Sequence, residues 1–187
     1  MYDEYEAVVF LTDGFEEIEA VSVMDVLRRG GVKVVSVSLT GKHEVMGKHY
    51  ITIVADKILD QAKDTHGSVL ILPGGPGFMK LKQHELLLEL LRLHHKDGGR
   101  IAAICAAPTV LGELGILTDK TAVCYPTMEN QLDAANISEA TTVTDENITT
   151  SKGPATSIEF ALEILRIIKG GTEAAKVADG MLFDYAT

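Results

Sequence analysis

Arg100-Ile-Ala-Ala-Ile-Cys105-Ala-Ala-Pro108-Thr-Val-Leu joins the pattern of a buried strand directly to that of a helix. The first half is the apolar run of a buried strand. The second half begins like a helix, with Pro108 in the first turn, where a missing N–H costs nothing. The residues around Cys105 are alanines apart from Ile104, and small residues suit a sharp strand-to-helix turn that carries a nucleophile. The helix directs free N–H groups and its positive dipole end at the sulfur, so we expect a stabilised thiolate. The alternative is a small buried hydrophobic cysteine, the usual role of a free thiol.

Buried-strand and helix patterns alternate along the rest of the chain. This alternation predicts an α/β fold with a mostly parallel sheet and helices on both faces. A hairpin outside the main sheet is predicted over residues 45–54. We expect strands over residues 7–11, 32–37, 68–72 and 100–105, weaker strands over 122–123 and 142–150, and helices over 16–29, 83–96, 108–114, 154–169 and 172–179.

Length and composition limit the classes of protein. The 187 residues fit one domain, residues 1–187, that buries a full core. A net charge of −10 makes nucleic acid and anionic membranes poor partners, and no apolar run is long enough to span a membrane. An acidic N-terminus and only two cysteines favour the reducing cytoplasm. The sequence has no CxxC motif and no Cys/His cluster, so we expect no metal site.

Three strand ends are expected to meet in one cleft, because ligands of such folds bind at the carboxyl ends of the strands. These ends are Thr12-Asp13-Gly14, Pro73-Gly74-Gly75 and Cys105. The glycine-rich end is either an ordinary turn or a source of backbone N–H groups for an oxyanion, with Gly75 and Ala106 as the donors. It lacks the GxxxxGK[ST] pattern of a phosphate loop.

A base for Cys105 is harder to assign. All six histidines lie upstream of it: His84, His94 and His95 on a polar helix, and His43, His49 and His66 in connecting segments, where we expect solvent exposure. The helix over residues 16–29 carries three early glutamates, of which two are explained by helix-dipole compensation. Glu19 has apolar neighbours and either shares that role or tilts into the cleft. There, burial would raise its pKa and let it hydrogen-bond a thiolate or shuttle a proton.

Other residues are expected near the cleft. We interpret Cys124 as a core or pocket residue rather than a resolving cysteine, and we expect Tyr125 to line the pocket. Gly74 is expected there too. Gly153 and Pro154 form either a simple helix entry or a turn that approaches the cleft.

Four motifs in order resemble the ThiJ/PfpI superfamily, in the branch of the parkinsonism-associated protein deglycase. They are Gly14-Phe-Glu-Glu-Ile-Glu19, Leu72-Pro-Gly-Gly75, Ala102-Ala-Ile-Cys-Ala-Ala-Pro108 and Thr150-Ser-Lys-Gly-Pro-Ala-Thr-Ser157. The resemblance implies a flavodoxin-like three-layer sandwich, of the class I glutamine amidotransferase type, and a homodimer without a cofactor. It implies that Cys105 is the reactive cysteine, Glu19 its carboxylate, and Gly75 and Ala106 the backbone donors.

Two departures from the family pattern bear on the activity. Ala106 stands where the peptidase-like branch has a histidine, which argues against a cysteine peptidase. Tyr125-Pro126 stands where the deglycase branch often has a histidine before a proline.

The resemblance implies an enzyme of carbonyl defence, a hydro-lyase or hydrolase. It would act as a glutathione-independent glyoxalase on methylglyoxal, or as a deglycase on its adducts. The alternative is an oxidative-stress sensor or chaperone with an oxidisable cysteine. A thiamine-pathway role has no support in these residues.

Overall fold

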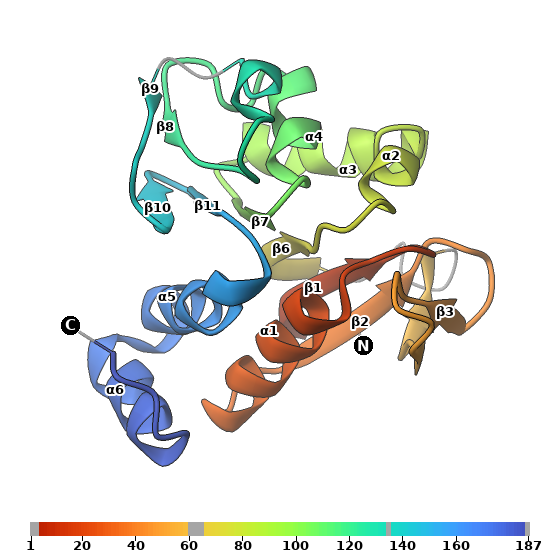
Figure 1. Ribbon diagram of the computed structural model, residues 1–187. Coiled ribbons are helices and arrows are strands. Elements are labelled where there is room, and N and C mark those ends of the chain that lie inside the picture. The colour runs from red at the N-terminus through yellow and green to blue at the C-terminus, as the bar shows by residue number, and fades with distance from the viewer. Residues whose placement is uncertain (1–3, 60–65, 134–135, 186–187) are drawn as a thin grey trace.

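A seven-stranded sheet forms the centre of the protein (Figure 1). The computed structural model describes residues 4–59, 66–133 and 136–185. The strand order is β10-β11-β7-β6-β1-β2-β5, and every neighbouring pair is parallel except β10 and β11. The predicted mostly parallel sheet is therefore confirmed. The strands are β1 (Glu4–Leu11), β2 (Val34–Ser38), β5 (Lys57–Ile58), β6 (His66–Leu72), β7 (Arg100–Ile104), β10 (Thr142–Asp145) and β11 (Ile148–Ser151).

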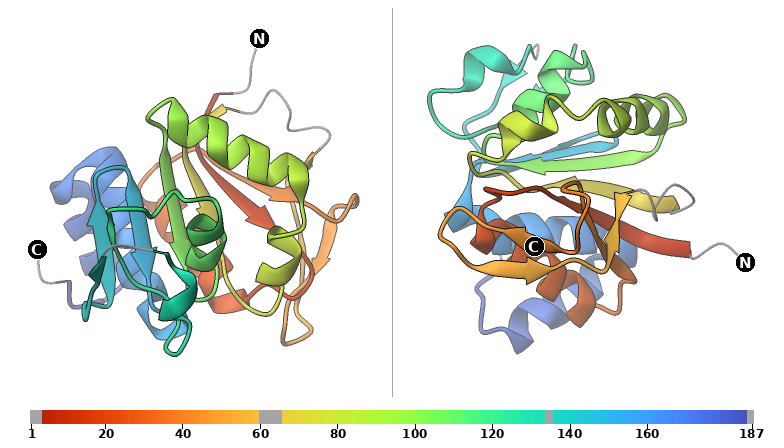
Figure 2. Two further views of the ribbon diagram at one scale, coloured as in Figure 1. Left: turned by 90° about the horizontal axis from the view of Figure 1, so that it is seen from above. Right: turned by 90° about the vertical axis from the view of Figure 1, so that its right-hand side faces the viewer.

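Helices cover both faces of the sheet, as predicted (Figure 2). One layer holds α1 (Glu17–Arg29), α5 (Ser157–Lys169) and α6 (Gly171–Gly180), and the other holds α2 (Phe78–Leu81), α3 (Glu85–Lys96) and α4 (Pro108–Glu113). Alternate residues of β1 serve two hydrophobic cores: Val9 belongs to the core beneath α1 and α5, and Val8 to the core beneath α3 and α4. A strand buried on both faces needs a continuous apolar run, which is the pattern read from the sequence. The fold is a three-layer, flavodoxin-like sandwich.

Short elements account for the differences from the sequence prediction. The hairpin outside the main sheet is confirmed as β3 (Glu44–Met46) and β4 (Thr52–Val54). The predicted strand at 122–123 is β8 (Thr121–Ala122), which pairs with an unpredicted β9 (Asn136–Ile137) in a separate small sheet. The segment 142–150 is two strands rather than one, and the helix predicted from residue 154 begins with a 3-10 turn, η3 (Pro154–Thr156). Elements of two to four residues are too short to show a hydrophobic period.

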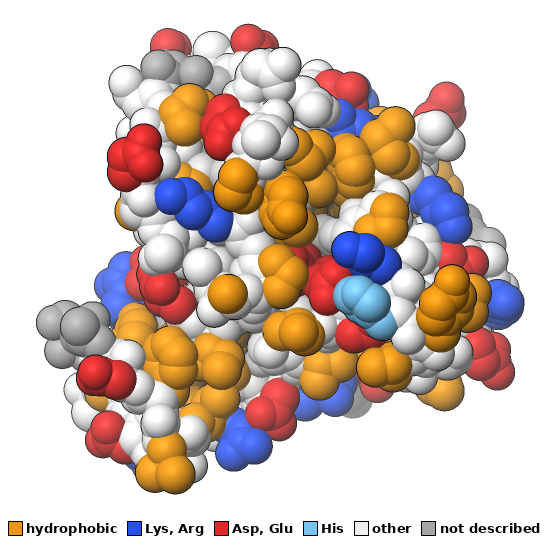
Figure 3. Space-filling view, viewed as in Figure 1, with side chains coloured by type: hydrophobic (Ala, Val, Ile, Leu, Met, Phe, Trp, Pro, Cys, Tyr) orange, Lys and Arg blue, Asp and Glu red, His pale blue; other side chains and the backbone are white. Residues whose placement is uncertain are grey.

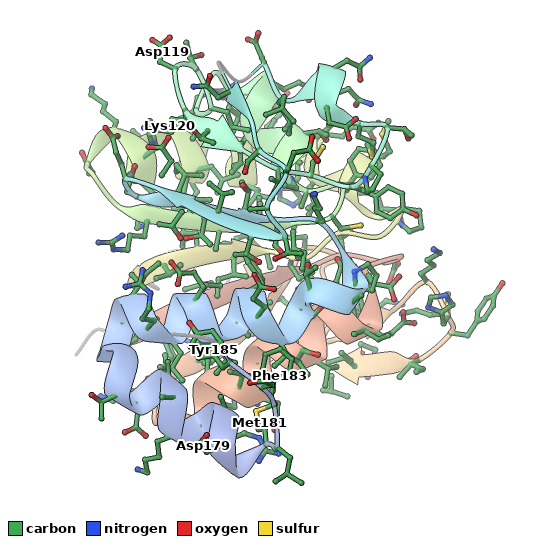
Figure 4. All side chains as sticks on the ribbon, turned by 60° about the vertical axis from the view of Figure 1, so that its left-hand side comes forward. Asp119, Lys120, Asp179, Met181, Phe183 and Tyr185 are labelled. Atoms are coloured by element: carbon green, nitrogen blue, oxygen red, sulfur yellow. The ribbon has the colours of Figure 1, made fainter. Side chains whose placement is uncertain are left out.

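The C-terminal segment folds back onto the α1 and α5 layer. After α6, Phe183 and Tyr185 are partly buried against the same core that α1 and α5 cover (Figure 4). In the described part of the chain, no helix combines the length and apolar character needed to cross a membrane.

Candidate active site

Cys105 lies at the turn between β7 and α4, in a backbone conformation that L-residues rarely adopt. Its φ is 64°, in the left-handed region, which costs of order 1–3 kcal/mol for a residue other than glycine. Main-chain hydrogen bonds on both sides fix the turn: Cys105 N–H donates to Ser151 O at 2.9 Å, and Tyr125 N–H donates to Cys105 O at 2.7 Å. The ends of two other segments therefore hold this sharp turn in place.

Glu19 reaches the cysteine from the first turns of α1. Its side chain is fully buried, and Oε2 accepts a hydrogen bond of 2.7 Å from the backbone N–H of Gly74. The carboxyl also hydrogen-bonds the Cys105 side chain. Its Oε1 has no N–H or O–H partner among the described residues. The structure thus brings together the cysteine and the carboxyl that the sequence analysis paired.

Burial raises the pKa of both members of this pair. It raises the pKa of Glu19 to about 7, against the opposing effects of the Gly74 N–H and the Cys105 thiol. Burial, followed by the negative charge of Glu19, raises the pKa of Cys105 to about 12. The expectation of a stabilised thiolate is therefore wrong for the resting pair. The N–H groups at the start of α4 favour the thiolate, but they are outweighed by lost hydration and by the neighbouring carboxylate.

The two predicted backbone donors lie against the sulfur. The N–H groups of Gly75 and Ala106 both hydrogen-bond the Cys105 side chain and lower its pKa in opposition to burial. Gly75 has a φ of 82°, and a Cβ there would lie 2.6 Å from the backbone nitrogen of Glu16. Only glycine allows the chain to pass this close to α1.

A cavity of about 320 Å³ opens beside the sulfur, near the lower end of the 300–1,000 Å³ typical of small-molecule sites. Of the residues expected to line it, Gly75, Ala106, Tyr125 and Pro154 do so. Gly74 and Gly153 do not line it. The Gly74 N–H is turned to Glu19, and Gly153 packs beneath the Tyr125 ring. The complete lining is Glu16, Lys48, Gly75, Pro76, Phe78, Cys105, Ala106, Tyr125 and Pro154.

The sequence analysis missed two charged residues of this cavity, Glu16 and Lys48. Glu16 was assigned to dipole compensation, but it is buried and its Oε2 lies 4.0 Å from Lys48 Nζ. Lys48 lies in the loop between β3 and β4, where a lysine gives no signal that separates it from an ordinary solvated residue. Figure 3 shows acidic, basic and histidine side chains gathered among hydrophobic ones on this face.

The histidines take other places. Among the described residues, no histidine lines the cavity. His94 and His95 are partly buried rather than solvated, and His43 is partly buried with its Nδ1 2.8 Å from Ala55 O. The side chain of His66 lies outside the described part of the chain. His49 is exposed as expected, but its Nδ1 lies 3.0 Å from Glu17 Oε2.

Ligand atoms of Glu16, Glu17 and His49 lie within 4.8 Å of one another, a spacing that a cation could use. Other groups of the protein already bind or pair with both carboxylates: Glu17 accepts a hydrogen bond from His49, and Glu16 forms an ion pair with Lys48.

Cys124 is buried apart from the cavity. Its Sγ donates to Tyr125 O at 3.3 Å, and burial raises its pKa to about 12. Both cysteines are free and buried.

Comparisons with known proteins identify relatives of this arrangement. The model of the DJ-1/PfpI family matches residues 5–167. The chain is 40% identical over 182 residues to protein dj-1beta of Drosophila melanogaster, covering 96% of this chain and 97% of that one. It is 36% identical over 157 residues to the glutathione-independent glyoxalase DJR-1.2 of Caenorhabditis elegans, covering 83% of each. The structure of oxidized Toxoplasma gondii DJ-1 superposes with a TM-score of 0.93 at 33% identity, over 97% of this chain and 100% of that one. With this match over most of its length, the chain belongs to the DJ-1/PfpI family.

Proposed function

We propose that this protein is a cysteine-dependent enzyme that converts small reactive dicarbonyls, such as methylglyoxal, without glutathione. The observation that carries the proposal is the buried pair of Glu19 and Cys105, in which Glu19 has a pKa of about 7 and one oxygen without an N–H or O–H partner. A general base works best when its pKa lies near the pH at which it operates. Glu19 thus takes the role that a histidine takes in cysteine peptidases.

The first step is addition of the sulfur to the aldehyde carbon. Glu19 accepts the thiol proton as the S–C bond forms. A free thiolate, which the raised pKa of Cys105 disfavours, therefore need not accumulate. The aldehyde oxygen gains negative charge, which the N–H groups of Gly75 and Ala106 stabilise. It then takes the proton from Glu19, which gives a hemithioacetal and restores the carboxylate.

The second step is an internal rearrangement. Glu19 removes the hydrogen from C1 as a proton, the electron pair passes toward the C2 carbonyl, and an enediol forms. Return of the proton to C2, with transfer of the C1 hydroxyl proton to the C2 oxygen, leaves a C1 thioester. C1 is thus oxidised and C2 reduced with no external redox partner. Water then hydrolyses the thioester, which releases lactate and restores the thiol.

The size of the cavity and one relative support this substrate class. A cavity of about 320 Å³ is large enough to accept a three-carbon dicarbonyl. The Caenorhabditis elegans relative is named a glutathione-independent glyoxalase. Deglycation of early methylglyoxal adducts begins with the same thiol chemistry and belongs to the same proposal.

The test is to incubate the purified protein with methylglyoxal and no glutathione, and to measure lactate by chromatography. We expect turnover to fall by about 100-fold or more in Cys105→Ala and in Glu19→Gln. Cys124→Ala is the matched control and should keep its activity, because Cys124 does not line the cavity. An active Cys105→Ala variant would contradict the proposal.

A redox-sensing role is the second candidate. It is favoured by the carboxyl beside the sulfur, since a protonated Glu19 could hold a sulfinate oxygen, and by the oxidized state named for the Toxoplasma gondii structure. Intact mass after mild peroxide treatment tests it: oxygen gained at Cys124 but not at Cys105 would exclude it.

We further infer a homodimer that works in the reducing cytoplasm. Exposed apolar side chains cover the outer face of α1 and the adjacent β3–β4 hairpin, a patch that would be covered by a second copy. Its members are Ile18, Val21, Met46, Ile51 and Val54.

A further inference from the structure

Among the described residues that line the cavity beside Cys105, Lys48 is the one cation. Its Nζ lies 4.0 Å from Glu16 Oε2, which is an ion pair beyond hydrogen-bonding distance. An ammonium carries three N–H donors and no acceptor, so this geometry leaves it able to bind an oxygen inside the cavity. Its charge also reaches the catalytic pair, because it lowers the pKa of Glu19 in opposition to burial.

The loop that carries Lys48 is fastened to the start of α1. The backbone N–H of Lys48 donates to Phe15 O at 2.9 Å, and the N–H of Gly14 donates to Met46 O at 2.8 Å. These bonds tie the first part of the loop, from Met46 to Lys48, to the residues that precede α1. The lysine is therefore positioned by main-chain contacts, although half of its side chain is exposed.

Glu17 completes this attachment without lining the cavity. Its Oε1 accepts from His49 N–H at 2.6 Å, and its Oε2 lies 3.0 Å from His49 Nδ1. A Cβ on Gly47 would collide with the Glu17 carboxyl. Burial opposes ionisation of Glu17, but these hydrogen bonds and its own helix-start N–H outweigh burial and lower its pKa. A buried, ionised carboxyl that binds His49, the residue after Lys48, and packs against Gly47, the residue before it, fits a positioning role.

We propose that Lys48 makes the cavity selective for carbonyl compounds that carry a second oxygen, as a ketone or a carboxylate, on the carbon next to the aldehyde. In this arrangement the N–H groups of Gly75 and Ala106 bind the aldehyde oxygen at the sulfur, and the Lys48 ammonium binds the neighbouring oxygen. Phe78, Pro76 and Pro154 offer only apolar contact to the rest of the ligand. The inference deepens the proposed function and depends on it only for Cys105 as the nucleophile.

The experiment compares the rates at which iodoacetate and iodoacetamide alkylate Cys105, measured by peptide mass in a Cys124→Ala background. In both reagents the thiolate displaces iodide, and in iodoacetate the charged oxygens lie on the carbon next to the reacting one. The ratio of the two rates cancels the fraction of thiolate, so a change in the pKa of Cys105 does not affect it. This measurement also does not require the protein to turn over a substrate.

We expect the iodoacetate-to-iodoacetamide ratio to fall by about tenfold in Lys48→Met, as for loss of a charge-assisted hydrogen bond. Lys48→Arg should keep most of the ratio. Lys42→Met is the matched control, an exposed lysine of the preceding loop outside the cavity, and should leave the ratio unchanged. Glu17→Gln, which keeps the lysine but weakens the attachment of its loop, should lower the ratio part of the way.

Protection of Cys105 from iodoacetamide by aldehydes separates the two kinds of oxygen. We expect methylglyoxal and glyoxylate each to need about tenfold higher concentration in Lys48→Met, and propanal to protect both proteins equally. If Lys48→Met weakens protection by glyoxylate but not by methylglyoxal, the ketone part of the inference is wrong. An unchanged alkylation ratio in Lys48→Met would overturn the whole of it, even if the protein converts methylglyoxal. Absence of methylglyoxal conversion together with the expected ratios would overturn the proposed function and leave the role of Lys48 standing.

Discussion

The backbone N–H of Gly74 donates to Oε2 of Glu19 at 2.7 Å, across 55 residues of sequence. This bond engages one oxygen of a fully buried carboxyl, and the other oxygen has no N–H or O–H partner among the described residues. The strand end after β6 therefore holds the Glu19 carboxyl in place beside Cys105.

Glu19 should make the stability of the protein depend on pH. Its pKa is about 7 when folded, against 4.5 as the ordinary value, so the folded protein binds more protons between these limits. The free energy of unfolding should fall as pH rises from 4.5 to 7, by roughly 3 kcal/mol from this group. Urea unfolding at pH 5 to 8 measures it. Glu19→Gln should flatten the dependence, whereas Glu89→Gln, on the exposed face of α3, should not. Parallel curves for Glu19→Gln and the wild type would contradict the assignment.

Removing the charge of Glu19 should make the thiol more acidic. That charge is the second largest cause, after burial, of the raised pKa of Cys105. In a Cys124→Ala background, Glu19→Gln should react faster with iodoacetamide at pH 8 than the parent protein, even though its turnover is lost. Reaction rates measured from pH 6 to 10 give the shift in pKa. A slower or unchanged rate at pH 8 would show that the carboxylate does not suppress ionisation of the sulfur.

Gly74→Ala should damage both packing and the site. A Cβ there would lie 2.6 Å from Cys105 Cβ and 2.9 Å from both Glu19 Oε2 and Ile104 O. Overpacking of this kind costs about 1–3 kcal/mol, and here it displaces the pair directly. Thermal unfolding and methylglyoxal turnover should both decline. Gly171→Ala, where nothing lies within 4 Å of the added atom, is the control and should retain both.

A single charged substitution tests where the inferred dimer interface lies. Val21→Asp places a carboxylate in the middle of the exposed apolar patch on α1, and it should convert a dimer to monomers in light scattering after gel filtration. Leu93→Asp is the matched control, because Leu93 is about equally exposed but lies on α3 in the opposite layer. If Leu93→Asp rather than Val21→Asp dissociates the protein, the interface lies on the α3 side.

Local patterns predicted the sheet, the large helices and the place of Cys105, because buried strands and capped helices leave a signal in nearby residues. The apolar neighbours of Glu19, Ile18 and Ala20, left open whether it compensates the helix dipole or enters the cleft, and its pairing with Cys105 came from the family resemblance. The role of Lys48 could not be predicted in this way. Its approach to the cavity depends on contacts with Phe15 and Glu17, more than thirty residues away. The acidity of Cys105 was predicted with the wrong sign because burial, which outweighs the helix start, is a property of the whole fold.

At residue 105 the left-handed backbone conformation costs stability, while the side chain supplies the thiol of the proposed mechanism. Glycine would adopt a φ of 64° without strain, and both hydrogen bonds that hold the turn are made by main-chain atoms, which any residue supplies. Stability alone would therefore favour glycine over cysteine at residue 105. Cysteine occupies this position against the preference of its own backbone, which fits the reactive role that we propose for its thiol.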